Sequence, residues 1–251
     1  MKNLNGKVAV VTGGARDIGK AISISLAKAG AKVIVNYFKS ESQGDETVAA
    51  IEKLGGTAVA VYADVTKQAD IDAMVKTTLD HFGPKIDILV NVAGGLFARK
   101  SIEEMDEDFY NLVMDVNLKS VFLVTKAIKP HMEKGGAIIN FASQAGRDGG
   151  GPGAAIYATS KGAVITYTRA LAKEFGPQGI RVNALCPGMI ATKFHDDFTK
   201  DEVREKVAGS TPLRREGEAE EVADLVVYLA SEQSSFITGN NIDINGGLAF
   251  S

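Results

Sequence analysis

The sequence predicts an α/β fold in which seven parallel strands form one doubly wound sheet covered by helices on both faces. Short runs of β-branched and apolar residues alternate with longer segments of helical character along the 251 residues. Several of these runs are apolar at consecutive positions, as in VAVV, VIV, ILV and AII, which is typical of strands buried on both faces. A glycine-rich turn follows the first run and opens a helical segment, as expected of a βαβ unit.

The individual elements follow from these patterns and from their end signals. Candidate strands cover residues 7–12, 32–36, 57–63, 86–91, 137–142, 181–185 and 241–244. Three of the intervening helices end clearly, since 18–29 stops before Gly30, 41–54 before Gly55 and 157–175 before Gly176. Right-handed crossovers between parallel strands place such helices on both faces of the sheet.

We expect residues 1–251 to form one domain, because a chain of this length with 45% apolar residues buries a substantial core. No repeat, low-complexity tract or linker rich in Pro and Ser divides the sequence. The glycine-dense segment 146–155 connects a strand to the next crossover helix, so we interpret it as a loop rather than a boundary.

The composition argues against several classes of protein. A net charge of −3 and a pI near 5.7 leave no broad basic face for nucleic acid or a membrane surface. No apolar stretch approaches the length of a membrane span, and the first apolar run is too short for a signal peptide. Cys186 is the single cysteine and His81, His131 and His195 are scattered, so we expect neither a disulfide nor a metal site. We therefore expect a cytoplasmic protein that acts on a small molecule.

The segment 12–19, TGGARDIG, follows the first strand and opens the first helix. In a doubly wound sheet this turn usually holds the diphosphate of a dinucleotide on the helix N-terminus. The carboxylate of Asp17 would repel that anion. We therefore expect Asp17 to turn away and to cap a helix that starts at Ile18, accepting the N–H of Gly19 or Lys20, because aspartate is a good N-cap and tolerates unusual backbone angles.

The end of the second strand indicates which dinucleotide binds. Enzymes that use NAD usually carry a carboxylate there for the ribose 2′-hydroxyl, whereas residues 36–40 of this chain read NYFKS. Arg16 and Lys39 supply positive charge for a 2′-phosphate, and Ser40 supplies a hydroxyl donor. These residues favour NADPH and NADP⁺ as the cofactor.

Tyr157 and Lys161 lie four residues apart on a predicted helix, so their side chains share one face. A tyrosine with a pKa near ~10 exchanges protons slowly at neutral pH, and a neighbouring ammonium group would lower that pKa. The pair is therefore suited to acid catalysis. Because the chain has six tyrosines, a chance Tyr-x-x-x-Lys on a solvated helix face is the competing interpretation, and the surrounding motifs favour catalysis.

Several motifs together resemble those of the short-chain dehydrogenase/reductase family, whose sheet is of the Rossmann type. Its first turn reads T-G-x-x-x-G-x-G; Thr12, Gly13 and Gly19 match, whereas Asp17 stands in place of the middle glycine. The segment 186–192, CPGMIAT, resembles the family's P-G-x-x-x-T, and 242–247, IDINGG, resembles its closing strand. The resemblance covers nearly the whole chain.

The resemblance implies four catalytic residues. Ser143 in INFASQAG and Asn117 in MDVNLKSVFLVTKA match the family's serine and asparagine, beside Tyr157 and Lys161. In such a set, Tyr157 protonates the substrate oxygen and Ser143 hydrogen-bonds the same oxygen. Lys161 binds the nicotinamide ribose and tunes Tyr157, and Asn117 holds a water in the proton relay.

The resemblance also extends the set of expected cofactor contacts. It assigns 64–65 to the adenine, 91–94 to the ribose and nicotinamide, and 187–192 to the nicotinamide carboxamide. Together with the residues above, the expected contacts are Gly13, Arg16, Asp17, Ile18, Gly19, Asn36, Tyr37, Lys39, Ser40, Asp64, Val65, Asn91, Ala93, Gly94, Tyr157, Lys161, Pro187, Gly188, Ile190 and Thr192.

Within that family, the chain most resembles 3-oxoacyl-[acyl-carrier-protein] reductases and similar NADPH-dependent ketoreductases. The resemblance implies reduction of a ketone to a secondary alcohol, with a 3-oxoacyl thioester or a similar carbonyl compound as substrate. Two features count against a carrier-protein partner. Pro130 and Gln178 stand where basic residues commonly flank the site mouth, and the interval from Ser143 to Tyr157 is one residue longer than usual.

Three alternatives remain open. Arg99, Arg147 and His195 are candidates to bind the carboxylate or phosphate of a small ketone such as a keto sugar acid, although each also fits a solvated surface charge. A dinucleotide-binding sensor would keep the fold without needing a catalytic serine and tyrosine. An enoyl reductase would space its tyrosine and lysine more widely. The resemblance further implies a homotetramer with the helices that bear Asn117 and Tyr157 at one interface.

Overall fold

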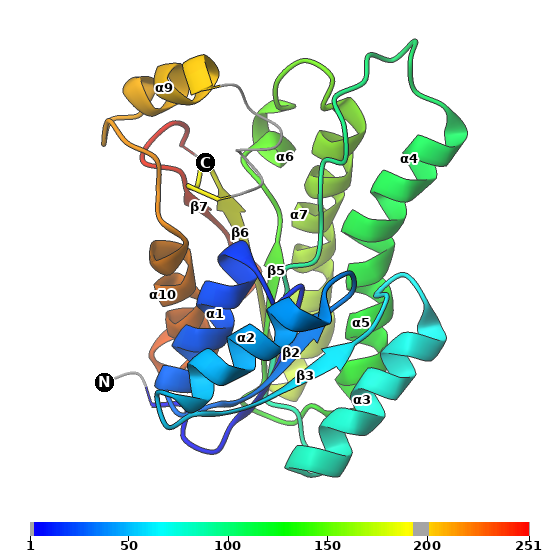
Figure 1. Ribbon diagram of the computed structural model, residues 1–251, viewed down its shortest axis with the longest axis vertical. Helices are drawn as coiled ribbons and strands as arrows, with labels where there is room; N and C mark the ends of the chain where they lie inside the picture. The colour runs from blue at the N-terminus through cyan, green and yellow to red at the C-terminus, as the bar shows by residue number, and fades with distance from the viewer. Residues whose placement is uncertain (1–2, 193–200, 251) are drawn as a thin grey trace.

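The computed structural model describes residues 3–192 and 201–250, and it confirms the predicted α/β fold. Seven parallel strands form one sheet in the order β3-β2-β1-β4-β5-β6-β7 (Figure 1). The strands are β1 (Val8–Thr12), β2 (Lys32–Tyr37), β3 (Thr57–Tyr62), β4 (Ile88–Asn91), β5 (Ala137–Phe141), β6 (Arg181–Pro187) and β7 (Asn241–Ile244).

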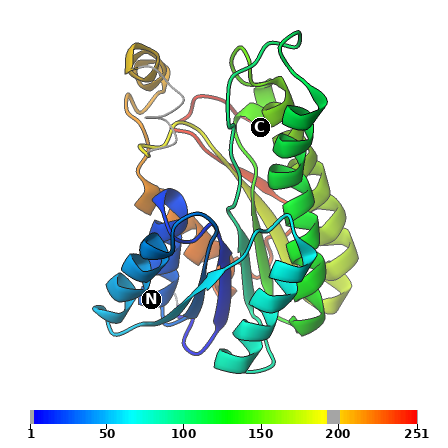
Figure 2. The ribbon, with the colours of Figure 1, turned by 45° about the vertical axis from the view of Figure 1, so that its right-hand side comes forward.

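Helices cover both faces of the sheet, as Figures 1 and 2 show. One face carries α1 (Asp17–Lys28), α2 (Glu41–Glu52) and α10 (Ala219–Ala230), and the other carries α3 (Gln68–Phe82), α5 (Ser120–Ile128) and α7 (Ala155–Phe175). The remaining helices are α4 (Glu107–Met114), α6 (Ala145–Asp148) and α9 (Asp201–Ser210), with short 3₁₀ turns at Lys129–His131, Gly176–Gln178 and Glu232–Ser234. No helix in the described ranges is long and apolar enough to cross a membrane.

The two-sided covering explains the consecutive apolar residues of the strands. All five residues of β1 are buried. Ala9 and Val11 belong to the core beneath α1 and α10, whereas Val8 and Val10 belong to the core beneath α3, α5 and α7. Because successive side chains of a strand point to opposite faces, a strand inside such a sheet needs apolar residues at every position.

The strand order reverses at β1. One edge of β1 pairs with β2 and the other with β4, so that Thr12 lies opposite Asn91 at the carboxyl ends. The crossovers on either side of this point leave in opposite directions, which opens a crevice outside the carboxyl ends of β1 and β4. A ligand of a doubly wound sheet binds at this position.

The observed elements differ from the predicted ones in their bounds by at most two residues at most ends, but one predicted helix differs in kind. The stretch MDVNLKSVFLVTKA, predicted as a single helical segment, contains a π-helical turn, Asp115–Lys119, between α4 and α5. A π turn is wider than an α-helical turn, and such turns occur frequently at functional sites. Asn117 lies within this turn.

Candidate active site

The first turn packs its own backbone closely, which requires glycine at two positions. A Cβ built on Gly19 would lie 2.0 Å from the carbonyl oxygen of Gly13, and one on Gly13 would lie 3.2 Å from the Cα of Ala93. Gly13 also has a φ of +63°, a conformation that costs glycine little. The turn therefore presents bare backbone at the start of α1, and in this respect it fits the diphosphate of a dinucleotide.

Asp17 does not have the predicted N-cap position. Helix α1 begins at Asp17 itself, and Arg16 occupies the N-cap position without a side-chain capping bond. Asp17 has a φ of +48°, in the left-handed region that aspartate tolerates better than most residues. Its carboxylate lies 3.7 Å from Nη1 of Arg16. Asp17 can thus stand where the family has a glycine, because aspartate tolerates the left-handed backbone at this position. The guanidinium group of Arg16 lies beside the negative charge of Asp17.

Two polar side chains hold the turn against neighbouring strands. Asn36 is 2% exposed; it accepts the N–H of Gly13 at 3.0 Å and donates to backbone carbonyl groups at the end of β3. Oγ1 of Thr12 accepts the N–H groups of Val92 and Ala93 at 3.1 and 3.2 Å. In the structure the Asn36 amide positions the turn, and the contact of Asn36 with the cofactor stays a prediction.

The residues expected near a 2′-phosphate lie at the starts of α1 and α2. The side chain of Arg16 is 60% exposed, and Lys39 is exposed just before α2. Ser40 is the N-cap of α2, and its hydroxyl accepts a backbone N–H of that helix at 3.4 Å. At the end of β2, the ring of Tyr37 packs edge-on against that of Tyr62, with 6.0 Å between the centroids. Two cations and one cap hydroxyl therefore border the same part of the crevice.

The segment assigned to the adenine follows β3. Oδ1 of Asp64 accepts the N–H and the hydroxyl of Thr66 at 2.9 and 2.7 Å, and Val65 is 7% exposed. The N–H of Asp64 donates to Oδ2 of Asp70 at 2.9 Å. The carboxylate of Asp64 thereby shapes the loop that leads into α3.

Gly94 and Gly95 bring the chain after β4 against the catalytic candidates. A Cβ built on Gly94 would lie 2.7 Å from Oδ1 of Asn117 and 3.0 Å from Nζ of Lys161. Asn117 is fully buried; it accepts the N–H of Gly95 at 3.0 Å and donates to the carbonyl oxygen of Gly95 at 2.8 Å. The π turn lets this amide face the 94–95 backbone while α4 and α5 continue on either side.

Lys161 is buried at the centre of the site. Its side chain is 4% exposed and Nζ donates to the carbonyl oxygen of Phe141 at 2.7 Å. Burial lowers the pKa of Lys161 from 10.5 to about 8, because the charged ammonium group loses its hydration. Lys161 therefore changes charge near physiological pH.

Tyr157 lies one helical turn before Lys161, and its electrostatics differ from the prediction. Burial raises the pKa of Tyr157 above 10.0, and a hydrogen bond with the Ser143 side chain opposes this effect. Nζ of Lys161 lies 5.9 Å from the centroid of the Tyr157 ring. The predicted lowering of the Tyr157 pKa by Lys161 is not what the structure shows, because burial raises this pKa and only the hydrogen bond with Ser143 acts in the opposite direction.

Ser143 follows β5 and opens the short helix α6. Its Oγ accepts the N–H of Ala145 at 3.1 Å, which orients the hydroxyl at the head of the turn. A Cβ built on Gly146 would lie 2.8 Å from the carbonyl carbon of Lys161. The turn that carries Ser143 therefore packs directly on the backbone of α7 at Lys161.

Asn91 lies beneath the site rather than at its surface. Asn91 is 3% exposed, and its Nδ2 donates to Oδ1 of Asn140 at 2.9 Å and to Oγ1 of Thr125 at 3.3 Å. Asn140 in turn donates to Oγ1 of Thr168 at 3.0 Å. This buried polar row connects α5, β4, β5 and α7, so the Asn91 side chain fixes the strand ends. The contact of Asn91 with the cofactor stays a prediction.

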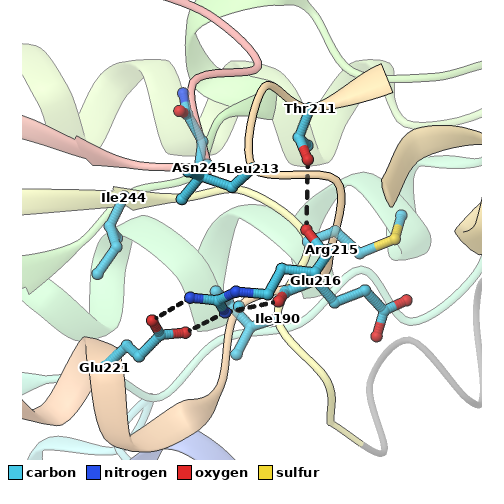
Figure 3. Close-up of a pocket in the computed structure, with 11 residues that line it drawn as sticks. Ile190, Thr211, Leu213, Arg215, Glu216, Glu221, Ile244 and Asn245 are labelled. Carbon is cyan, nitrogen blue, oxygen red and sulfur yellow. Dashed lines mark hydrogen bonds and ion pairs between the residues drawn. The ribbon is translucent and has the colours of Figure 1, made fainter. Parts of the chain in front are cut away.

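The segment after β6 lies against the residues that follow β7. The N–H of Gly188 donates to the carbonyl oxygen of Ile244 at 3.0 Å, and a Cβ on Gly188 would lie 2.8 Å from the Cα of Asn245. Ile190 is 3% exposed and lines a cavity of about 90 Å³ (Figure 3). Oγ1 of Thr192 donates to the carbonyl oxygen of Ile190 at 3.1 Å. The side chain of Ile190 thus faces this cavity.

The loop after Gly95 is strained at Phe97. The N–H of Ala98 donates to the carbonyl oxygen of Leu96 at 2.8 Å, and Phe97 between them has a φ of +64°. A three-residue turn of this kind is rare and strained, and a bulky residue is an outlier at positive φ. The ring of Phe97 packs on Gly95, whose Cβ would lie 3.3 Å from it.

The loop that follows β4 and the glycine-dense loop 146–155 are joined to each other. The N–H of Lys100 donates to the carbonyl oxygen of Gly153 at 3.1 Å, and Nη1 of Arg99 donates to that of Pro152 at 3.0 Å. The glycine-dense loop is therefore held against the loop that follows β4.

Several predictions about charged and flanking residues are corrected. Arg147 was a candidate anion-binding residue, but its guanidinium group pairs with Asp243 at 3.1 Å, with the two side chains 20% and 14% exposed. Pro130 and Gln178 lie in turns that precede β5 and β6. These turns are at the amino ends of the strands, opposite the edge that carries Ser143, so these two residues do not flank the site mouth. His195 lies outside the described residues.

Gln144 and Asn245 are two buried residues beside the site that the sequence did not point to. They are 7% and 9% exposed, and Nδ2 of Asn245 donates to Oε1 of Gln144 at 2.7 Å. Gln144 directly follows Ser143. The close packing of Gly188 on Asn245, which brings Asn245 to the site, is visible only in the folded chain.

The fold and the site together define a nucleotide-dependent oxidoreductase: a doubly wound parallel sheet, a glycine turn at its switch point, and a Ser, Tyr and Lys group at the same edge. A family model described as "Enoyl-(Acyl carrier protein) reductase" matches residues 13–249. The chain is 42% identical to a 3-oxoacyl-[acyl-carrier-protein] reductase of Synechocystis sp., covering 99% of both chains. It is 40% identical to glucose 1-dehydrogenase 2 of Bacillus subtilis, covering 98% of this chain and 96% of the relative.

A solved structure shares the whole architecture. The blue fluorescent protein from a metagenomic library in complex with NADPH superposes with a TM-score of 0.92 at 35% identity, covering 99% of this chain and all of that one. The chain belongs to the short-chain dehydrogenase/reductase family. It is therefore an enzyme of a family that binds a nicotinamide dinucleotide.

Proposed function

We propose that this enzyme reduces a ketone to a secondary alcohol with NADPH, with Tyr157 as the proton donor. The observation that carries this proposal is the grouping of three side chains at the carboxyl edge of the sheet. Tyr157 shares a hydrogen bond with Ser143, and Nζ of Lys161 lies 5.9 Å from the Tyr157 ring. A hydroxyl, a phenol and an ammonium group so arranged suit protonation of a carbonyl oxygen.

Each residue has a distinct part in the proposed reaction. The hydroxyl groups of Tyr157 and Ser143 donate to the substrate oxygen, and Tyr157 transfers its proton as negative charge develops there. Lys161 places a cation beside the phenolate that remains. Asn117 fixes the 94–95 backbone and holds the water through which the proton is replaced. Hydride transfer to the carbonyl carbon is the chemistry that the dinucleotide supplies when bound.

The cofactor is NADP(H) in this proposal because the crevice edge near β2 carries cations. Arg16 is 60% exposed at the start of α1 and Lys39 is exposed before α2. The turn, the segments 64–65, 91–94 and 187–192, and these cations form the proposed binding surface. Arg16→Ala and Lys39→Ala should each raise KM for NADPH on the order of 10-fold and leave KM for NADH unchanged. Lys28→Ala, at the far end of α1, is the matched control, and equal use of both cofactors by the parent enzyme would contradict the assignment.

The substrate is a 3-oxoacyl thioester or a similar carbonyl compound in this proposal, which the 42% identity to a 3-oxoacyl-[acyl-carrier-protein] reductase supports. A small polar ketone such as a keto sugar acid is the second candidate, which the 40% identity to a glucose 1-dehydrogenase supports. NADPH oxidation with 3-oxoacyl thioesters, keto acids and cyclic ketones decides between them. A keto sugar acid turned over with a kcat/KM a hundredfold above that for any thioester would favour the second candidate.

The decisive variant is Tyr157→Phe. It should lower kcat by about 10²- to 10⁴-fold, as expected for loss of a general acid, while NADPH still binds, as measured by cofactor fluorescence. Tyr167→Phe on the same helix is the matched control. Full turnover in Tyr157→Phe would show that the phenol is not the proton donor, and loss of NADPH binding would point to a structural role.

We also propose that residues 1–251 form one domain and that the enzyme is a cytoplasmic homotetramer. The face formed by α4 and α5 supports assembly, because Tyr110, Leu112 and Phe122 are each 44% exposed there. Light scattering after size exclusion should give four times the mass of the chain. Phe122→Glu should reduce that mass, and a monomeric parent protein would contradict the proposal.

A further inference from the structure

We propose that Asn245, which follows β7, is a positioning residue that sets the place of Ser143 through the side chain of Gln144. Nδ2 of Asn245 donates to Oε1 of Gln144 at 2.7 Å, and Nε2 of Gln144 donates to Oδ2 of Asp148 at 3.1 Å. The three side chains form a row that begins after β7 and ends in the glycine-dense loop. Ser143 immediately precedes the middle member of this row.

The direction of the hydrogen bonds in this row is fixed by chemistry. An ionised carboxylate accepts hydrogen bonds only, so Asp148 requires the NH₂ group of Gln144. The oxygen of Gln144 must then face Asn245 and requires its NH₂ group. The oxygen of Asn245 is left to accept the N–H of Gly247 at 3.0 Å, as observed. Asn245 must therefore be a donor toward Gln144, a role that aspartate cannot take.

The Ser143 turn is held from two sides. On one side, Gly146 packs on the backbone of Lys161, where a Cβ would lie 2.8 Å from the carbonyl carbon. On the other side, the N–H of Gln144 donates to the carbonyl oxygen of Pro187 at 2.9 Å, in addition to the bond from Asn245. Asn245 also lines the cavity of Figure 3, where it lies near Ile244 and Leu213. Without the donor at residue 245, one of the two supports is weakened.

Displacement of Ser143 has a chemical signature. The hydrogen bond from Ser143 is the effect that lowers the pKa of Tyr157 against the effect of burial. A shifted Ser143 would therefore raise the pH at which Tyr157 releases its proton. Lys161 lies on the same helix as Tyr157 and touches neither Gln144 nor Asn245 in the described contacts, so its influence stays constant in the comparison.

The experiment exchanges the hydrogen-bond donor and acceptor at the two ends of the row formed by Asn245, Gln144 and Asp148. In Asn245→Asp, two acceptors face each other whichever way Gln144 turns, and we expect kcat to fall on the order of 10- to 100-fold. The pH midpoint of alcohol oxidation should move upward, and the dissociation constant for NADPH should stay within twofold. In Asn245→Asp combined with Asp148→Asn, Gln144 turns over, donates to residue 245 and accepts from residue 148. The double variant should recover part of kcat and bring the pH midpoint back toward the original value, although a carboxylate at residue 245 still loses the bond that Asn245 donates to the carbonyl oxygen of Ala249 at 3.0 Å.

Controls separate positioning from folding and from the proposed catalysis. Asn240→Asp adds the same charge at the opposite end of β7 and should leave both readouts unchanged. Asn245→Ala, which removes the donor without adding charge, serves if Asn245→Asp does not fold, and it should also lower kcat and raise the pH midpoint. An unchanged kcat and pH midpoint in the residue 245 variants, or a double variant no better than Asn245→Asp, would overturn the role of Asn245. Because this role rests on the proposed function of Ser143 and Tyr157, Tyr157→Phe is measured alongside, and its full activity would instead refute the proposed function.

Discussion

Lys161→Met should make the folded protein more stable at neutral pH while abolishing the proposed chemistry. Burial lowers the pKa of Lys161 from 10.5 to about 8. At about 1.4 kcal/mol for each pH unit of this difference, holding the charge inside the fold costs about 3 kcal/mol below pH 8. Methionine has a similar length and carries no charge.

Part of this gain is offset by a lost hydrogen bond. Nζ of Lys161 donates to the carbonyl oxygen of Phe141 at 2.7 Å, and losing a hydrogen bond from a charged donor costs roughly 1.5–3 kcal/mol. We therefore expect Lys161→Met to raise the free energy of unfolding at pH 7 by about 1 kcal/mol. Turnover falls in the same variant, as in other proteins where an active site is maintained at the expense of stability.

The dependence on pH isolates the charge from the packing. Between the folded pKa of about 8 and the unfolded value of 10.5, the unfolded chain binds more protons than the folded one, so the stability of the parent protein rises with pH. The cost of the charge is fully present below pH 8 and disappears as the pH approaches 10.5. The free energy of unfolding of the parent should therefore rise, relative to that of Lys161→Met, by about 2 kcal/mol between pH 7 and 9.5.

Urea unfolding at pH 7, 8 and 9.5 measures this difference. The protein concentration is kept constant and no dinucleotide is added, because ligands and partner subunits that bind only the folded state add stability of their own. Lys173→Met, an exposed lysine on the same helix, is the matched control and should show no trend of this kind. A constant difference between parent and Lys161→Met across the three pH values would refute the argument from burial.

Three further predictions concern the backbone. Phe97→Gly should be more stable than Phe97→Ala by about 1 kcal/mol in urea unfolding, because alanine keeps the left-handed strain at φ +64° and glycine does not; equal stability would argue against the strained turn. Gly19→Ala should lose more than about 3 kcal/mol, since its Cβ would lie 2.0 Å from a carbonyl oxygen, whereas Gly209→Ala, with open space around it, should be tolerated. Asp17→Gly should change the dissociation constant for NADPH less than tenfold by calorimetry, and a gain of orders of magnitude would show that the carboxylate opposes the diphosphate.

The sequence predicted those features that depend on local pattern. Consecutive apolar residues identify strands buried on both faces, and the spacing of Tyr157 and Lys161 places them on one side of a helix. These two kinds of pattern were enough to predict the parallel sheet and the edge at which the candidate site lies.

Features that depend on distant contacts were missed. The bond between Gln144 and Asn245 joins residues 101 positions apart, and no periodicity marks it. The π turn at Asn117 and the left-handed backbone at Asp17 depend on what packs against each segment. The effect that opposes burial on the Tyr157 pKa was expected from Lys161 and comes from Ser143. Spacing along a helix shows which residues are close but not which group makes the hydrogen bond.

The junction between the loop after β4 and the glycine-dense loop has a practical consequence for altering selectivity. Lys100 and Gly153 share a main-chain bond of 3.1 Å, and Arg99 donates to Pro152. A substitution that moves either loop must therefore also move the other loop or break these two hydrogen bonds. Directed-evolution libraries that randomise both stretches together should yield more active clones with new substrate ranges than libraries confined to one of them.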